Sequence, residues 1–243
     1  MAGGTGVAGR HVVEAVSGAG HEPVVLARSR GVDLTTGAGL DRALDGVSAV
    51  VDVSNVTTLS RRAAERFFVR ASENLLAAAK GAGVRHHVLL SIVGVDRSPL
   101  GYYKAKLRQE TEVLAGPLPA TVLRATQFHE FVDQTLARVP GPAAFVPRMR
   151  VQPVAASEVA EHLVQIAVGE PQRRAADLAG PEVHEIVDLA REVTAARGLR
   201  RRVVPLRVPG GAGRAMTDGS LLPTVDGPRG RITFREWLDA EIT

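Results

Sequence analysis

The sequence predicts an α/β protein with a doubly wound parallel sheet and a small C-terminal lobe. From the N-terminus to about residue 124, short apolar runs alternate with segments whose apolar residues recur at helical spacing. This alternation is typical of a parallel sheet covered by helices. A glycine-rich turn also opens the first helical segment. At 243 residues, 45% of them hydrophobic, the chain is long enough to bury a sizeable core.

The glycine-rich turn places Gly3, Gly6 and Gly9 three residues apart, directly before an amphipathic segment over residues 10–16. Glycine lets the backbone turn tightly, approach a pyrophosphate without a Cβ in the way and bring a helix close to a sheet. The N–H groups at the start of that helix then face the phosphates. The turn therefore favours a Rossmann-type dinucleotide site. The alternative is a plain loop in a chain with 25 glycines.

An arginine follows the second predicted strand. Residues 21–27 are interpreted as a short buried strand, and Arg28 stands at its carboxyl end, where the adenosine ribose of a dinucleotide lies in such folds. An acidic residue there would bond a free 2′-hydroxyl, as in NAD sites, whereas an arginine suits a 2′-phosphate. We therefore expect NADP as cofactor, with NADPH favoured over NADH. The alternative is that Arg28 is one more surface arginine.

The next elements continue the alternation of helix and strand. We expect a short helix near 40–44, a buried strand at 48–53, a helix at 60–80, a strand at 87–93, a helix at 102–114 and a strand at 120–124. These elements complete the predicted sheet and its covering helices.

The regular alternation of strands and helices ends after residue 124. Prolines between 140 and 153, Pro140 among them, break the chain into short pieces, and helices are predicted at 157–168 and 183–197. Thr233 and Glu236 form a capping-box pattern at the start of the last predicted helix. We expect residues 1–150 to form an NAD(P)-binding Rossmann domain and residues 151–243 a small substrate-binding lobe, interleaved with the first as a single structural unit.

The first strand of the predicted fold is nearly absent, because only Met1 and Ala2 precede Gly3. Without it, its two neighbours in the sheet would lose hydrogen-bonding partners, which is costly in a buried sheet. We expect a truncated first strand and a natural product longer by about six to eight apolar residues. Met1 would then stand at an internal valine codon that was read as a start.

Composition excludes several classes of function. The chain has no cysteine, so disulfides, thiolate metal sites and cysteine nucleophiles are excluded; no metal site is expected. It has no apolar run of about 18 residues and no signal-peptide pattern, so we expect a cytoplasmic protein without a membrane partner. Its net charge is +4 and aromatics make up 4% of residues. We interpret its arginines as surface residues and expect a small-molecule substrate and no nucleic-acid partner.

A tyrosine and a lysine mark the catalytic candidate. Tyr102 and Lys106 lie four residues apart on a predicted helix, hence on one face. The chain has only 2 tyrosines, and three of its 30 Lys and Arg residues are lysines, so the pairing is uncommon by chance. A nearby ammonium should lower the phenol pKa and allow Tyr102 to act as a general acid or base. The alternative is a surface helix pair with a partly buried tyrosine.

Together these features resemble the short-chain dehydrogenase/reductase superfamily, in particular its atypical NmrA-like NAD(P)H-binding branch. The resemblance covers essentially the whole chain. Its markers are the Gly3, Gly6 and Gly9 turn, Arg28, the segments 32–34 and 90–96, Tyr102 with Lys106 and Glu110, and the segments 121–128, 152–154, 158–160 and 180–182.

The resemblance implies a role for each matched residue. Gly3, Thr5, Gly6, Val7 and Gly9 would hold the pyrophosphate, Arg28 the 2′-phosphate, Asp33 would lie near the adenine, and Ser54 and Asn55 beside the adenosine ribose. Lys106 would hold the nicotinamide ribose, Tyr102 would be the acid or base, and Gln127 and Phe128 would flank the nicotinamide and substrate. Ser91 is the candidate for the serine that relatives place beside the tyrosine. It stands one or two residues early, where Ile92 or Val93 would face the site.

The function implied is that of an NADPH-dependent oxidoreductase that reduces a carbonyl or quinone-like small molecule. The same branch includes NADP-binding proteins that act as redox-sensing regulators without turnover, and this is the alternative. An epimerase-like use of the cofactor would require sugar-nucleotide contacts that the sequence does not identify. The sequence discloses neither the substrate nor the oligomeric state.

Overall fold

The structure, a computed structural model, describes residues 1–58, 60–138 and 141–242, so Pro140 lies outside the described residues. The chain forms two compact units. The first comprises Met1–Ile92, Gly101–Arg124 and Ala156–Ala176, and the second Val93–Leu100, Ala125–Ala155 and Asp177–Thr243. The chain therefore passes between the units several times, and no single boundary near residue 150 separates them. The predicted α/β class with a parallel central sheet is confirmed.

The sheet of the first unit has the order β1-β2-β3-β6. Its strands are β1 (Ala49–Asp52), β2 (His86–Ile92), β3 (Ala120–Ala125) and β6 (Arg173–Arg174). β1 pairs with β2, and β3 with β6, in parallel. β2 is buried along nearly its whole length, as expected of a strand covered on both faces.

The first residues of the chain extend the sheet beyond β1. Ala2 forms parallel bridges to Asp52 on one side and to Leu26 on the other. The Ala2 N–H donates to the Val51 carbonyl at 2.9 Å, and the Leu26 N–H donates to the Met1 carbonyl at 2.9 Å. The predicted strand over 21–27 is wrong in extent, because Leu26 is the one residue of this described segment that forms a bridge, to Ala2. The Met1 ammonium adds a hydrogen bond to the Val24 carbonyl at 2.8 Å.

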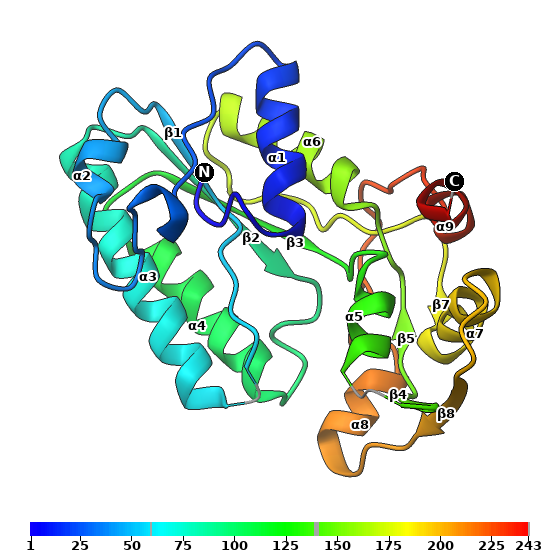
Figure 1. The fold of residues 1–243 in the computed structure, drawn as a ribbon. Helices are drawn as coiled ribbons and strands as arrows, with labels where there is room; N and C mark the ends of the chain where they lie inside the picture. The colour runs from blue at the N-terminus through cyan, green and yellow to red at the C-terminus, as the bar shows by residue number, and fades with distance from the viewer. Residues whose placement is uncertain (59, 139–140, 243) are drawn as a thin grey trace. The chain divides into compact units, whose positions relative to one another are not determined.

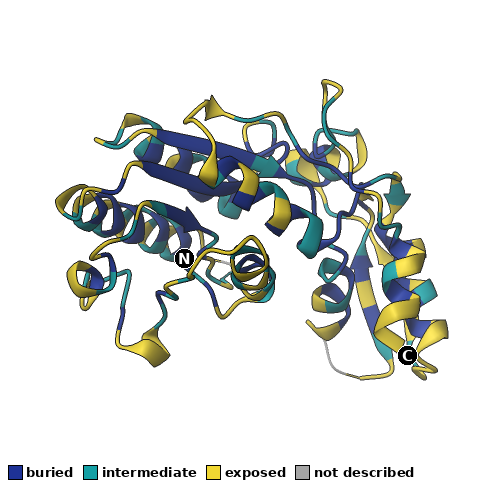
Figure 2. Ribbon diagram, turned by 90° about the horizontal axis from the view of Figure 1, so that it is seen from above, coloured by how far each residue is buried: buried dark blue, intermediate teal, exposed yellow. Residues whose placement is uncertain are grey.

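Helices cover the two faces of this sheet (Figure 1). α1 (Val7–Gly18) packs against α6 (Ala156–Val168), and α6 also contacts β1 and β2. On the other face α3 (Arg61–Gly81) packs against α4 (Gly101–Ala115), with the short α2 (Leu40–Ala43) against α3. Figure 2 shows buried residues along the strands and on the inner sides of the helices, with exposed residues outward. The predicted helices at 60–80 and 102–114 are thus confirmed.

The second unit contains two small sheets. β4 (Ala143–Pro147) pairs in parallel with β8 (Arg202–Leu206), and β5 (Arg150–Val151) pairs antiparallel with β7 (His184–Glu185). Its helices are α5 (Phe131–Ala137), α7 (Ile186–Ala196), α8 (Gly210–Thr217) and α9 (Phe234–Ile242). The capping box of α9 is confirmed: the Thr233 N–H donates to Glu236 at 2.8 Å, and the Glu236 N–H donates to the Thr233 hydroxyl at 3.2 Å.

None of the helices among the described residues combines the length and the apolar character that crossing a membrane requires. Within the same residues, no cluster of three or more His, Asp or Glu side chains is arranged to hold a metal ion.

Candidate functional site

The glycine turn leads from Ala2 into α1, as the sequence predicts. Gly3 has φ +80°, which favours glycine. A Cβ on Gly3 would lie 2.9 Å from backbone atoms of Ser54, and a Cβ on Gly9 would overlap the Gly3 carbonyl oxygen and lie 2.7 Å from the Gly4 Cα. Packing of the turn against the β1 loop and of α1 against the turn therefore requires glycine at both positions.

The third glycine of the motif is not required by packing. A Cβ on Gly6 would meet only the Gly3 carbonyl oxygen, at 3.4 Å, and both Gly6 and Thr5 are exposed. Gly6 precedes the first turn of α1, and its carbonyl accepts the Arg10 N–H at 3.0 Å. A surface without a Cβ before a 12-residue helix fits an anionic group such as a pyrophosphate.

Three loops leave the sheet at the same edge. Ala2 lies between Leu26 and Asp52, so the glycine turn, Arg28 and the Ser54–Asn55 loop all follow the carboxyl ends of neighbouring strand positions. Ligands of open α/β sheets bind in this position. The structure thus brings the predicted pyrophosphate, 2′-phosphate and ribose residues to one end of the first unit.

Arg28 opens a short 3₁₀ helix, Arg28–Arg30, and its side chain is exposed. Asp33 lies near it. The Thr35 hydroxyl donates to the Asp33 carboxylate at 2.6 Å and the Thr35 N–H at 2.8 Å. These hydrogen bonds, with a smaller contribution from the charge of Arg28, hold the pKa of Asp33 below its usual range. Asp33 therefore organises its own loop and places a carboxylate within electrostatic reach of Arg28.

Tyr102 lies in the first turn of α4 and contacts the β1 loop. Its hydroxyl donates to the Asn55 Oδ1 at 2.6 Å, joining residues 47 positions apart. Burial raises the pKa of Tyr102 to about 12, and Tyr103 adds to the increase. The prediction that Lys106 lowers this pKa is wrong, because Lys106 is not among the groups that shift it.

The Lys106 ammonium is held by a buried chain of polar groups. Its Nζ donates to the Gln109 Oε1 at 2.7 Å, the Gln109 Nε2 donates to the Asp52 carboxylate at 3.1 Å, and the Ser54 N–H donates to Asp52 at 2.8 Å. The Nζ also lies 4.8 Å from the centre of the Phe68 ring. Burial lowers the pKa of Lys106 to about 8, against the opposing influence of Asp52 and Glu110.

Gln109 and Asp52 are two residues that the sequence reasoning missed. Both are fully buried. The available signals were weak: Gln109 follows Lys106 at i+3 on the same helix, and Asp52 is an acidic residue that ends an apolar strand. The amide accepts from the ammonium and donates to the carboxylate, so it links α4 to the loop that carries Ser54 and Asn55.

Ser91 lies on β2 and is buried, and its hydroxyl has no hydrogen-bond partner among the described residues. No hydrogen bond there joins it to Tyr102. On α4, burial alone would raise the pKa of Glu110, but hydrogen bonds from Arg124 and Arg174 lower it. Arg124 donates to both carboxylate oxygens, at 2.9 and 2.8 Å, and Arg174 donates at 2.9 Å. Glu110 therefore stands at the centre of a charged cluster that joins α4, β3 and β6.

Gln127 and Phe128 belong to the second unit. The Gln127 carbonyl accepts the Val154 N–H at 2.9 Å, and Phe128 forms a parallel bridge to Val154. The Gln127 side-chain amide is buried, and neither its oxygen nor its nitrogen has a hydrogen-bond partner among the described residues. Such an amide is suited to a polar ligand.

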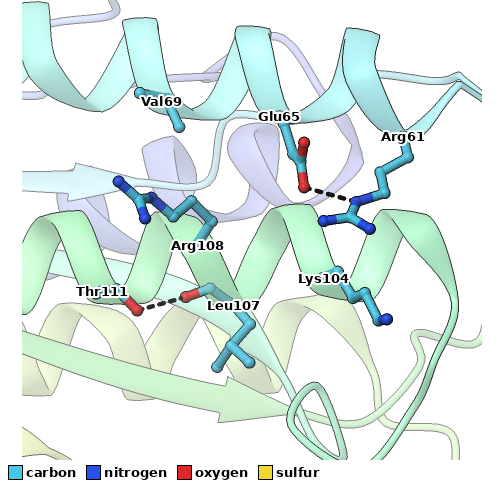
Figure 3. A pocket seen from close by; sticks show the side chains of 7 residues that line it. All are labelled: Arg61, Glu65, Val69, Lys104, Leu107, Arg108 and Thr111. Atoms are coloured by element: carbon cyan, nitrogen blue, oxygen red, sulfur yellow. Dashed lines mark hydrogen bonds and ion pairs between the residues drawn. The ribbon is translucent and has the colours of Figure 1, made fainter.

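A pocket of about 440 Å³ lies between α3 and α4 (Figure 3). Arg61, Glu65, Lys104 and Arg108 are among its lining residues, and none of the sequence-predicted site residues lines it. Arg61 pairs with Glu65 at 2.7 Å, and Arg108 with Glu112 at 2.6 Å. The positive charges of both arginines are thus largely neutralised within their own helices.

The buried lysine predicts a pH dependence of stability. Because the folded pKa of Lys106 is about 8 and its ordinary value 10.5, the unfolded chain holds more protons between these values, and stability rises with pH across them. Below pH 8 the lysine is charged in both states, and burying its charge lowers the free energy of unfolding by the full amount, about 3 kcal/mol. We expect Lys106→Met to abolish this rise in urea unfolding followed from pH 8 upward.

The matched control for Lys106 is the exposed Lys104 on the same helix. Lys104→Met should keep the parent's rise in unfolding free energy. Tyr102, with its pKa raised to about 12 from 10, acts in the opposite sense above pH 10, so each variant is compared with the parent at the same pH. A Lys106→Met protein that retained the full rise would contradict the assignment.

The chain was compared with known proteins. No protein-family profile matches it. It is 32% identical over 155 residues to a (4-alkanoyl-5-oxo-2,5-dihydrofuran-3-yl)methyl phosphate reductase of Streptomyces griseus subsp. griseus. The match covers 58% of this chain and 50% of that protein. The chain therefore spans about half the length of its curated relative.

Two solved structures share the fold over nearly the whole chain. MoeE5 in complex with UDP-glucose and NAD has a TM-score of 0.78 at 19% identity, covering 99% of this chain and 96% of that one. An NADPH-dependent quinone oxidoreductase of Escherichia coli has a TM-score of 0.68 at 18% identity, covering 100% and 98%. At these identities the likeness shows the fold alone, which is a Rossmann-like α/β fold.

Proposed function

We propose that the protein is an NADPH-dependent oxidoreductase of the atypical, NmrA-like short-chain dehydrogenase/reductase type, which reduces a carbonyl or quinone-like small molecule. The observation that carries the proposal is the hydrogen bond of Tyr102 to Asn55. This hydrogen bond joins the Tyr102 phenol on α4 to the loop after β1. The glycine turn and Arg28 lie at the same end of the sheet as that loop. A proton donor and a dinucleotide cradle thus occupy one end of the first unit.

The residues present fit a dinucleotide. Gly6 provides a surface without a Cβ before α1, so that Gly3, Thr5, Gly6, Val7 and Gly9 would hold the pyrophosphate. In the same proposal Arg28 takes the 2′-phosphate, Asp33 lies near the adenine, Ser54 and Asn55 beside the adenosine ribose, and Gln127 and Phe128 flank the nicotinamide and substrate. The bound nicotinamide supplies the hydride.

Tyr102 would supply the proton in this proposal. Burial raises its pKa to about 12, so its hydroxyl is protonated at neutral pH and can donate to the more basic alkoxide that hydride transfer to a carbonyl forms. Lys106 would hold the nicotinamide ribose. An ammonium has three N–H donors, of which Gln109 takes one, so Gln109 and Asp52 would orient Lys106 while it binds the ribose hydroxyls.

The relatives support the chemistry at two levels. The curated relative is named as a reductase of a furanone that carries a methyl phosphate, a small carbonyl compound. The Escherichia coli protein of similar fold is named as a quinone oxidoreductase that uses NADPH. We test the proposal with a panel of aldehydes, ketones, quinones and phosphorylated carbonyl compounds, with NADPH consumption as the readout. Absence of consumption across the panel, with intact NADPH binding, would contradict it.

Cofactor preference yields a second test. In the proposal the Arg28 guanidinium binds the 2′-phosphate through charge-assisted hydrogen bonds, so Arg28→Ala should weaken NADPH binding by about 2 kcal/mol and leave NADH binding nearly unchanged. Calorimetric titration of both cofactors measures the difference. Arg30→Ala, in the same 3₁₀ helix and equally exposed, is the control and should leave both affinities unchanged. An equal loss of affinity for NADPH and NADH would show that Arg28 supports the structure of the site rather than binding the 2′-phosphate.

A non-catalytic, NADP(H)-binding redox-sensing regulator is the second candidate, and the burial of Ser91 favours it. Ser91 is buried, and its hydroxyl has no hydrogen-bond partner among the described residues, so no hydrogen bond links it to Tyr102 as part of a Ser-Tyr-Lys triad. A regulator would bind NADPH tightly, consume none on the panel, and change its affinity for a protein partner between NADP and NADPH. The same panel and titrations therefore separate the two candidates.

A further inference from the structure

The second unit gathers arginines that have no carboxylate partner. A pocket of about 360 Å³ is lined by Arg148, Arg207, Val208, Gly213, Arg214 and Thr217. Within the described part of the chain, no hydrogen bond or ion pair joins these three guanidinium groups to a carboxylate. The pocket between α3 and α4 differs in this respect, since Arg61 and Arg108 there pair with Glu65 and Glu112.

The fold places two of these arginines side by side. β4 and β8 are parallel, with Pro147 in register with Leu206, so Arg148 and Arg207 both follow the carboxyl ends of paired strands. The Arg148 N–H donates to the Leu206 carbonyl at 2.9 Å, which continues the pairing to these residues. Both side chains are exposed, so both are accessible to a dissolved ligand.

The third arginine comes from α8. A Cβ on Gly213 would overlap the Val208 carbonyl oxygen, so glycine at this position lets α8 pack tightly against the residues that follow β8. Arg214 follows directly, and its side chain is exposed. The Thr217 hydroxyl donates to main-chain carbonyls of α8, to Gly213 at 3.1 Å and Arg214 at 3.2 Å. Because the Thr217 hydroxyl is already engaged with the main chain, the guanidinium groups are the side-chain donors of this pocket that can bind a ligand.

The carboxylate of Asp218 lies within electrostatic reach of Arg214. The pKa of Asp218 is lowered, mainly by hydrogen bonds from Ser220 and to a smaller extent by the charge of Arg214. Its Oδ1 accepts the Ser220 N–H at 2.9 Å. Three guanidinium groups beside this one carboxylate still leave an excess of two positive charges. Their mutual repulsion is relieved when a multivalent anion binds between them.

We propose that this pocket is an anion site that recognises the phosphate-monoester group of a small molecule, the substrate of the proposed reductase. A phosphate dianion offers three acceptor oxygens, and guanidinium groups bind such oxygens through two parallel hydrogen bonds. No aromatic side chain lines the pocket, so it lacks the stacking surface of a single-strand nucleic-acid site. The anion site is inferred from the charge and geometry of its arginines. Only the inference that the bound phosphate belongs to the reductase substrate depends on the proposed function.

Calorimetric titration of the full chain tests the site directly. The probes are dihydroxyacetone phosphate, dihydroxyacetone and inorganic phosphate, so that the carbonyl and the phosphate are varied separately. We expect the two phosphates to bind and dihydroxyacetone not to bind. Arg207→Ala should weaken binding about tenfold or more, and the triple alanine variant of Arg148, Arg207 and Arg214 should abolish it. Arg207→Lys should keep part of the affinity, because lysine retains the positive charge but cannot donate the two parallel hydrogen bonds of a guanidinium group.

Matched variants separate this site from general basicity. Arg108→Ala removes an exposed arginine that is paired with Glu112, and it should leave phosphate binding unchanged. Thermal unfolding of the triple variant checks that the fold is retained. Unchanged phosphate binding by a folded triple variant would overturn the proposal, as would tighter binding of a DNA duplex than of either phosphate.

The experiment distinguishes this site from the proposed reductase activity. Phosphate binding that depends on the three arginines, without NADPH consumption on any substrate, supports the anion site and contradicts the reductase. NADPH-dependent reduction of unphosphorylated carbonyl compounds without phosphate binding supports the reductase and overturns the anion site.

Discussion

Tyr102→Phe should lower the turnover number for NADPH-dependent reduction by about 10²- to 10⁴-fold, the range expected for loss of a general acid. The phenylalanine keeps the ring that packs against Phe68 and removes only the hydroxyl that donates to Asn55. The affinity for NADPH should therefore change little. Steady-state kinetics on the first active substrate of the panel, with calorimetric titration of NADPH, provides both measurements.

The control for this variant is the other tyrosine of the chain. Tyr103 is the next residue of α4 and is buried, so Tyr103→Phe makes the same chemical change one position away. It should preserve turnover. Equal activity of Tyr102→Phe and the parent would remove Tyr102 from the mechanism, whereas equal losses in both variants would indicate a structural effect of the helix.

Gly9→Ala should destabilise the fold by about 3 kcal/mol or more and abolish NADPH binding. The added Cβ would overlap the Gly3 carbonyl oxygen and crowd the Gly4 Cα, and backbone atoms cannot move aside as a flexible side chain does. The helix would have to shift away from the turn. Since whole domains are stable by only about 5–15 kcal/mol, urea unfolding should show the loss clearly.

The same helix contains the control for this substitution. Gly18 ends α1 and has no atom near the position of its Cβ. Gly18→Ala should leave NADPH binding unchanged and stabilise the protein by up to about 1 kcal/mol, because alanine restricts the unfolded chain. A stable, NADPH-competent Gly9→Ala protein would show that the turn tolerates a side chain there.

Local signals were sufficient to predict much of the first unit and the last helix of the second. The glycine turn, the two long helices predicted at 60–80 and 102–114 and the capping box at Thr233 depend on residues close in sequence, and the structure confirms each. The second unit was harder to predict, since β4 and β8 each contain a proline and pair across about 60 residues. Short strands of this kind form through their partners rather than through their own periodicity.

The environment of the catalytic candidates was not predictable from spacing. Positions i and i+4 predict that Tyr102 and Lys106 share a helix face, but the pKa of each depends on burial and on distant partners. Tyr102 meets Asn55, and Lys106 reaches Asp52 through Gln109. Both partners come from the β1 strand and the loop after it, about 50 residues earlier. Burial also outweighs the neighbouring charges for Lys106.

The interleaving of the two units restricts how their sequences can be recombined. α6 belongs to the first unit although it directly follows the segment 125–155, which belongs to the second. A chimaera with a single crossover at residue 150 would pair a foreign α6 with the resident α1, β1 and β2, which it contacts, and its buried Val159 and Leu163 would have to fit an unrelated surface. Transfer of the whole second unit between related chains therefore requires several crossovers, flanking 93–100, 125–155 and 177–243.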